Sequence, residues 1–102
     1  MTFGSQIAEA RKALGMSQKD LAAKITKEDG EPISPQYLND IEHDRRNPPS
    51  EDMIYQFARE LKLEPEVLFY LAGKLPQDFT KTAAESERIV AAYQAFRKAL
   101  KK

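Results

Sequence analysis

The chain has 102 residues, of which 41% are apolar and 31% are charged, and its 16 basic and 16 acidic side chains cancel. This length fits one small domain with a single core, and the neutral balance argues against a non-specific coat on nucleic acid, although not against a local basic surface. Cysteine is absent, no apolar run is long enough to span a membrane, and the first ten residues lack a secretory signal, so we expect a cytoplasmic protein.

Two helices are predicted at the start of the chain. Within residues 3–14 the apolar side chains recur at the spacing of one helix face, and Gly15 follows as a C-terminal stop. A second helix is predicted over residues 17–25, because the hydroxyl of Ser17 can cap it and Asp20, three residues later, completes a capping box.

The next segment, residues 26–33, breaks the helical pattern. Asp29 and Gly30 favour a tight turn with positive backbone angles, and Pro32 does not continue a helix. The segment is predicted to be a loop, with a small hairpin as the alternative. A third helix is predicted to follow it over residues 34–44.

Two unlike faces distinguish this third helix. Ser34 at its cap and a proline at its first position mark its start, and Leu38 and Ile41 point toward the core. Four polar side chains share the opposite face: Gln36, Asn39, Asp40 and His43. Gln and Asn place a donor beside an acceptor, which matches the N6 and N7 edge of adenine in the major groove of DNA. The alternative is a face that only contacts solvent.

Three more helices are predicted after a pair of prolines. Ser50 begins the fourth, whose apolar stripe lies within residues 53–61. The fifth, residues 67–72, is apolar nearly all round and is interpreted as core packing. A capping box of Thr82 and Glu85 begins the last, whose apolar face packs either on its own domain or on a second copy. That face consists of Ile89, Tyr93, Phe96 and Leu100.

Together, the second and third helices and their connection form a helix-turn-helix pattern, in which the second helix enters the major groove. The stretches GMSQKDLAAKI (15–25), ISPQYLNDIEHDRRNPP (33–49) and MIYQFARELKL (53–63) resemble helices two to four of the lambda-repressor-like, or XRE-type, family of prokaryotic and phage transcription regulators. The resemblance covers about residues 3–73. It rests on the SQ-x-x-LA start, the small Ala22, the Ile-Glu pair and the basic-Asn-Pro exit, which occur in the expected order.

The resemblance implies an all-α fold, with a five-helix DNA-binding domain over residues 1–75. Residues 76–102 are expected to form a linker and an amphipathic helix for packing or dimerisation. The implied function is sequence-specific transcription regulation, expected as repression by a homodimer on a palindromic operator in double-stranded DNA. Either the fifth or the last helix is expected at the dimer interface. The alternative is a protein-interaction module, such as an antitoxin or adaptor, that holds a partner protein through the C-terminal helix.

Carried over residue by residue, the family pattern also implies the site. Base contacts are expected from Pro35, Gln36, Asn39, Asp40 and His43. Phosphate contacts are expected from Ser17, Gln18, Lys19, Ser34, Tyr37, Arg45, Arg46 and Asn47. Arg11 and Glu42 match a pair that ties the first helix to the third in this family, and they are assigned to structure.

Two departures from the family pattern affect the recognition helix. Asp44 stands where the family usually has glycine, so the end of the third helix is expected to differ. The connection between residues 25 and 34 is longer than the usual turn and carries three acidic side chains, which repel phosphates. This loop is therefore expected to lie off the DNA or to narrow the range of targets.

Other kinds of site find little support. A metal site at His43 and Asp44 would need more histidines than the single one present, and there is no cysteine and no glycine-rich phosphate loop. We therefore expect no enzyme activity, no cofactor, no metal and no membrane association.

Overall fold

The computed structural model describes residues 1–47, 49–81 and 85–101, and over these ranges the secondary structure is helical apart from one isolated antiparallel bridge between Thr26 and Pro32. The expected all-α fold is confirmed. The helices in the described ranges are α1 (Phe3–Ala13), α2 (Gln18–Ala22), α3 (Pro35–Glu42), α4 (Glu51–Leu61), α5 (Pro65–Ala72), α6 (Gln77–Lys81) and α7 (Ser86–Leu100).

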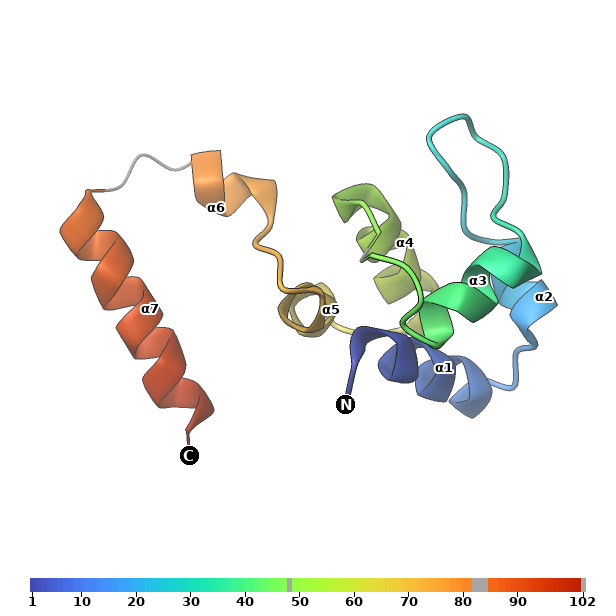
Figure 1. Cartoon of the computed structure of the whole chain (residues 1–102), viewed down its shortest axis with the longest axis horizontal. Helices are drawn as coiled ribbons and strands as arrows, with labels where there is room; N and C mark the ends of the chain where they lie inside the picture. The colour runs from blue at the N-terminus through green and yellow to red at the C-terminus, as the bar shows by residue number, and fades with distance from the viewer. Residues whose placement is uncertain (48, 82–84, 102) are drawn as a thin grey trace.

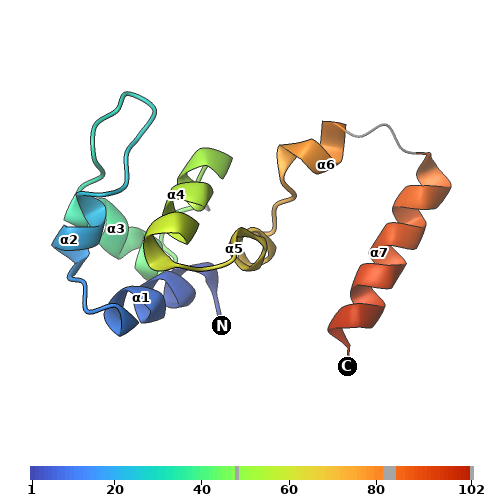
Figure 2. The same ribbon diagram turned by 180° about the vertical axis from the view of Figure 1, so that it is seen from behind.

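Helices α1 to α5 pack around one apolar core. α3 lies against both α1 and α2, while α4 and α5 pack on each other and on α1. Figure 1 shows these five helices gathered together, with α6 and α7 extending away from them. The view from behind in Figure 2 shows the same separation of α7. Long apolar side chains from all five helices fill the core, and those with no exposed surface include Ile7, Leu21, Leu38, Ile54, Phe57 and Leu68.

Serine caps begin α2, α3 and α4 as the sequence predicts. Ser17 Oγ accepts the backbone N–H of Asp20 at 3.0 Å, and the Asp20 carboxylate accepts the Ser17 N–H at 3.1 Å. Ser34 Oγ accepts the Tyr37 N–H at 3.0 Å, and Ser50 Oγ caps α4 in the same way. Each hydroxyl pairs an N–H group that the helix itself leaves without a partner.

The predicted ends of two helices need correction. α2 stops at Ala22 rather than at Ile25, because the chain turns there into the hairpin, yet Ile25 is still fully buried. α3 spans Pro35–Glu42 rather than 34–44, with His43 as its C-cap. The next residue, Asp44, has a φ of 57° and ends the helix in the left-handed conformation that the family usually gives to glycine.

Residues 26–33 form the small hairpin that the sequence left as an alternative to a loop. Gly30 has a φ of 86°, but Asp29 is not in the left-handed region, so the expected pair of positive angles is wrong at Asp29. Its carboxylate instead accepts the N–H of Glu31 at 2.9 Å. Short polar side chains often stabilise turns through this kind of bond.

Beyond α4 the sequence was less informative. α6 (Gln77–Lys81) was not predicted, because five residues are too few to show a helical period. α7 begins at Ser86, and Glu85 at its N-cap makes no side-chain capping bond. The predicted capping box also needs Thr82, which lies outside the described residues.

The interpretation of the fifth helix as core packing holds for one of its faces but not for the other. Only Leu68 and Phe69 of α5 are buried, whereas the side chains of Val67 and Tyr70 are exposed. The ring of Tyr70 meets the ring of Phe96 on α7 edge to face, with 6.0 Å between centroids. α5 therefore has an inner face on the core and an outer face toward α7.

Asp44 links the end of α3 to the start of α1. Its carboxylate accepts the N–H of Gly4 at 2.9 Å and the hydroxyl of Thr2 at 2.6 Å. A Cβ atom added at Gly4 would clash with the carbonyl oxygen of Ile41 and lie 2.6 Å from that of Glu42. The two backbones therefore approach each other at a distance that only glycine permits.

Replacement of Gly4 by alanine is expected to destabilise the protein by about 1–3 kcal/mol, because the carbonyl oxygens that a methyl group would meet belong to the backbone. Elsewhere in a helix the same change stabilises by about 0.5–1 kcal/mol. Urea unfolding measures the difference. Gly30→Ala is the control, because its Cβ meets no atom within 4 Å and only the backbone angle is strained. A Gly4→Ala variant as stable as the wild type would contradict the close approach.

Candidate nucleic-acid interface

The side chains expected to contact DNA lie along α3, at the start of α2 and in the loop after α3. Pro35, Gln36 and His43 are exposed on α3 and its C-cap, and Asn39 and Asp40 are half-buried between them. Of the expected phosphate contacts, Tyr37 and Gln18 are half-buried, and the others are exposed: Ser17, Lys19, Ser34, Arg45, Arg46 and Asn47. Printed contacts bring some of them together: Gln18 meets Asn39, and Gln36, Arg45 and Arg46 gather around Asp40.

A buried ion pair lies behind this surface. The guanidinium group of Arg11 donates to both carboxylate oxygens of Glu42, with Nε to Oε2 at 2.7 Å and Nη2 to Oε1 at 3.0 Å. It also donates to the backbone oxygen of Met16 at 2.9 Å. The side chains of Arg11 and Glu42 are only 10% and 3% exposed. The expected structural pair is therefore present, and it joins α1, the α1–α2 connection and α3.

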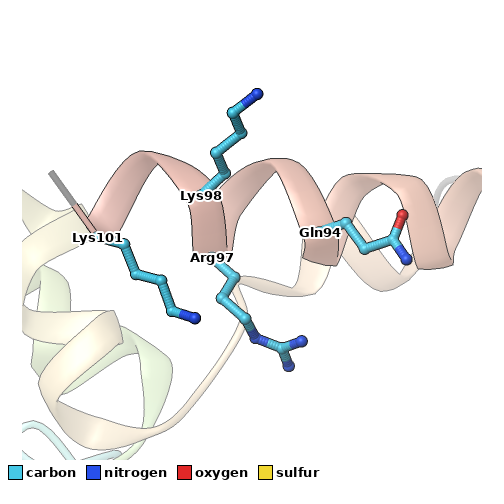
Figure 3. Close-up of a pocket in the computed structure, with 4 residues that line it drawn as sticks. All are labelled: Gln94, Arg97, Lys98 and Lys101. Carbon is cyan, nitrogen blue, oxygen red and sulfur yellow. The ribbon is translucent and has the colours of Figure 1, made fainter.

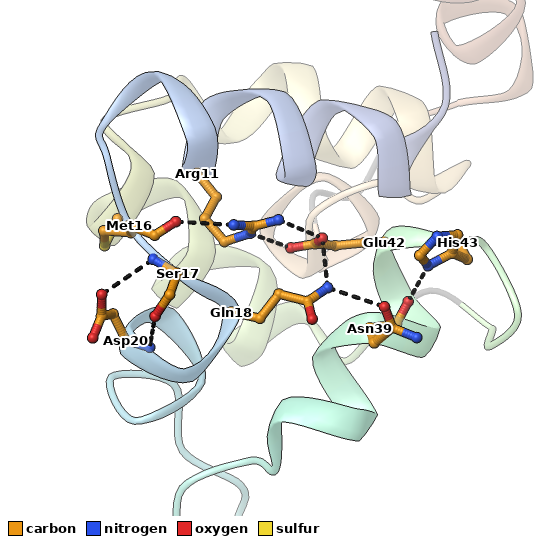
Figure 4. A network of polar contacts seen from close by, with 8 residues as sticks. All are labelled: Arg11, Met16, Ser17, Gln18, Asp20, Asn39, Glu42 and His43. Atoms are coloured by element: carbon orange, nitrogen blue, oxygen red, sulfur yellow. Dashed lines mark hydrogen bonds and ion pairs between the residues drawn. The ribbon is translucent and has the colours of Figure 1, made fainter.

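Gln18 extends this pair to the face of α3. Its Nε2 donates to Glu42 Oε1 at 3.0 Å and to Asn39 Oδ1 at 3.1 Å, which uses both amide hydrogens. Figure 4 shows the continuous chain of contacts from Arg11 through Glu42 and Gln18 to Asn39. The expected phosphate contact thus orients the expected base contact. The amide nitrogen of Asn39 is left to donate outward.

His43 is oriented by the backbone of α3. Its Nδ1 donates to the carbonyl oxygen of Asn39 at 2.8 Å. Because a carbonyl oxygen only accepts, Nδ1 carries the proton, and in the neutral ring Nε2 is an acceptor. The bond to the Asn39 carbonyl thus fixes the orientation of the His43 ring on the outer side of α3.

A second polar cluster forms around Asp40. Its carboxylate accepts the amide of Gln36 at 3.1 Å and lies 3.8 Å from Arg45 Nη1 and 3.7 Å from Arg46 Nε. The guanidinium group of Arg46 also stacks on the ring of Tyr37, 4.3 Å from its centroid. Both arginines of the loop after α3 are thus held near the helix.

The start of α2 carries a fixed negative charge as well as amide donors. Hydrogen bonds from the backbone and then the side chain of Ser17 lower the pKa of the Asp20 carboxyl below its ordinary value, and Lys24 and Lys19 lower it slightly further. Asp20 is therefore ionised at neutral pH. Lys19, on the exposed first turn, offsets this charge where a phosphate is expected.

Two positioning residues were not recognised from the sequence. Gln56, on α4, is 8% exposed and accepts the N–H of Thr26 at 2.8 Å while its Nε2 donates to the Thr26 carbonyl at 3.0 Å. This pair of bonds holds the hairpin that precedes α3. For Asp44, nothing in the sequence indicated its bonds to Thr2 and Gly4. A glutamine within a helical stripe gives no sequence signal of such a role, because its partner is backbone 30 residues away.

Sites of other kinds are not found in the part of the chain that the structure describes. No three His, Asp or Glu side chains there lie close enough together to hold a metal ion. No helix within the described ranges combines the length and the apolar character needed to cross a membrane.

Comparison with known proteins agrees with this geometry. The sequence profile of a family described as helix-turn-helix matches residues 7–68. Among solved structures, the chain is similar to one from the SinR protein/SinI protein complex, with 23% identity, 96% of this chain and 99% of that chain covered, and a TM-score of 0.55. At this identity the likeness shows the fold alone. No curated protein matches the chain.

Removal of one partner from the buried ion pair is expected to cost about 3–5 kcal/mol of unfolding free energy, because the other charge is left without a counterion. Arg11→Met and Glu42→Leu test this in urea. The double variant is expected to lose much less unfolding free energy than the sum of the losses in the two single variants. The control is Arg59→Met with Glu60→Leu, a surface pair of an exposed arginine and a half-buried glutamate that is expected to contribute about 1 kcal/mol. Additive losses at Arg11 and Glu42 would contradict a tightly coupled pair.

Proposed function

The chain belongs to the XRE-type, lambda-repressor-like helix-turn-helix family of DNA-binding transcription regulators, and on this basis we propose that it represses transcription as a homodimer on a palindromic operator. α3 would lie in the major groove and exclude polymerase by occupying the site. Because such a regulator binds chromosomal or phage DNA inside a prokaryotic cell, we propose that it acts in the cytoplasm. This mechanism needs no cofactor and no catalytic step.

The observation that carries the proposal is the arrangement of α3. Its outer face presents Gln36, Asn39 and His43, and Arg45 and Arg46 follow at its end. An α-helix fits the major groove, where amide side chains pair with adenine. Guanidinium groups beside it can reach the phosphates of the groove wall. Base-reading and phosphate-binding groups thus occupy neighbouring positions on one surface.

Asn39 and Gln36 differ in what they offer to a base. Asn39 uses its oxygen to accept from Gln18, whereas Gln36 uses one amide hydrogen in its bond to Asp40. Gln36 therefore has an oxygen and a second amide hydrogen for a bidentate pair with adenine. We assign the adenine contact to Gln36, and a donor role toward an acceptor edge to Asn39.

The proposal of a homodimer rests on α7. Its residues are all exposed in the single chain, and Ile89, Tyr93, Phe96 and Leu100, which share one face, are each about half exposed. A 15-residue helix gains little stability in water by itself. The ring of Phe96 meets that of Tyr70, and the surface that these side chains expose in the single chain is proposed to be covered by a second copy.

Charge favours pairing of α7 with the outer surface around Tyr55 of α4. Desolvation raises the pKa of Tyr55 above its ordinary value, and the negative charges of Glu51, Asp78 and Glu66 raise it further. α7 is basic near its end: Figure 3 shows Arg97 and Lys101 projecting to one side of the helix and Lys98 to the other. The acidic surface of one copy and the basic end of α7 of another are complementary.

A second candidate is a complex with a different protein. The similar solved structure comes from a complex of two proteins, SinR and SinI. By analogy, the apolar face of α7 would hold a partner chain in place of a second copy. The two candidates predict different behaviour for the chain alone, because only self-association gives a dimer without a partner.

Alanine at Arg45 and Arg46 is expected to weaken binding to all duplexes alike and to reduce the slope of affinity against salt by about one for each phosphate that is no longer bound. Gln36→Ala is expected to reduce discrimination at one base pair by about 1–3 kcal/mol with little change in slope. A binding site selected from a randomised duplex pool supplies the specific probe. Arg59→Ala on α4 is the control. Equal effects of Gln36→Ala on every sequence would contradict the assignment of α3.

A glutamate at Phe96 or Ile89 is expected to weaken dimerisation at least about thirtyfold, because a charge would be buried in the apolar interface. Sedimentation velocity over a range of concentrations measures the dissociation constant. Ala91→Glu is the matched control, because it adds the same charge on the exposed face of α7 opposite Ile89 and Phe96, and it is expected to keep the dimer. A wild-type chain that stays monomeric throughout would contradict the homodimer and favour a partner protein.

A further inference from the structure

We propose that Asp40 is a positioning residue of the interface, which acts through Arg45, Arg46 and Gln36 rather than on a base. Its charge weakens the phosphate contacts of the two arginines on every sequence, and its carboxylate orients Gln36 for reading. Base contacts thereby supply a larger share of the binding free energy than they would without this charge. The inference rests on the proposed DNA-binding function, and it gives Asp40 a different role from the base contact expected from the sequence.

The geometry places the carboxylate below the two arginines. The side chain of Asp40 is 22% exposed, whereas those of Arg45 and Arg46 are 61% and 49% exposed. The nitrogen–oxygen distances of 3.8 and 3.7 Å are longer than hydrogen bonds. The arginines are therefore attracted to Asp40 without being locked to it, and a DNA phosphate can compete for them.

This competition lowers affinity in a way that does not depend on sequence. Phosphate contacts supply nearly all of the binding to random DNA and carry no sequence information. An ionised carboxylate beside the arginines repels the same phosphates and gives the guanidinium groups an internal counterion. Removal of its charge is therefore expected to strengthen binding to every duplex and to steepen its dependence on salt.

The bond to Gln36 acts on discrimination instead. Because a carboxylate only accepts, the amide nitrogen of Gln36, and not its oxygen, faces Asp40 at 3.1 Å. The two residues are one helical turn apart, so the amide is held in one orientation. The positions of its oxygen and its second amide hydrogen toward a base are then fixed. An asparagine at position 40 keeps an acceptor for this bond, whereas an alanine removes it.

The test compares Asp40→Asn with Asp40→Ala. A duplex is first selected by the wild-type chain from a randomised pool, and its affinity and that of a scrambled duplex are measured at several salt concentrations. Asp40→Asn is expected to bind both duplexes about three- to tenfold more tightly, with a steeper salt slope and unchanged discrimination. Asp40→Ala is expected to bind the scrambled duplex more tightly than the wild type does. It is also expected to lose discrimination at the base pair that Gln36→Ala affects.

Glu60→Gln is the matched control, because it removes the same charge from an ion pair on α4, which carries none of the expected DNA contacts. Thermal unfolding checks that each variant is folded. An Asp40→Asn variant that behaves like Glu60→Gln would overturn the role of the charge, and an Asp40→Ala variant that keeps full discrimination would overturn the role in orienting Gln36. Weaker binding of Asp40→Asn to the selected duplex alone would mean that Asp40 contacts a base directly.

Failure of the proposed function gives a separate result. A wild-type chain that selects no sequence and binds no duplex would contradict DNA binding itself, and the inference would fall with it. A wild-type chain that selects a site, together with Asp40 variants that match the control, would leave the proposed function intact and overturn the inference alone.

Discussion

The buried pair of Arg11 and Glu42 is the interaction on which the interface depends. Two charges that are nearly inaccessible to water need each other and further hydrogen bonds to offset their desolvation. The bonds to Met16 and Gln18 supply these, and they also fix how α1, α2 and α3 lie together. Since Gln18 in turn holds Asn39, the geometry of the outer face is set from the interior.

Hydrogen bonds to other helices also fix the chain at both ends of α3. Before the helix, Gln56 holds the hairpin to α4 through the backbone of Thr26. After it, Asp44 accepts the left-handed conformation that glycine would take more easily, and its carboxylate caps the start of α1. The bonds that it gains offset the backbone strain. Both ends of α3 are thereby tied to the rest of the fold.

No described residue of α6 or α7 belongs to the buried core of α1 to α5. The core formed by α1 to α5 is complete without them, and α7 exposes the apolar face that its sequence pattern predicted. An apolar face of this kind gains stability only when something covers it. On the proposed function, the helices that contact DNA belong to the core of α1 to α5, while the apolar face of α7 is covered by a second chain.

The sequence by itself determined the helices of the core, their serine caps and the polar face of α3, because periodicity and capping are local properties of the chain. The family pattern also indicated the Arg11–Glu42 pair. Only the tertiary structure decided which polar groups meet: Asp40 with Arg45 and Arg46, and Gln56 with Thr26. Such partners depend on how elements pack and where loops turn. The same dependence on packing hid the exposed face of α5, since the pattern of an apolar helix is the same whether it faces a core or another helix. α6 was missed because five residues are too few to show a helical period.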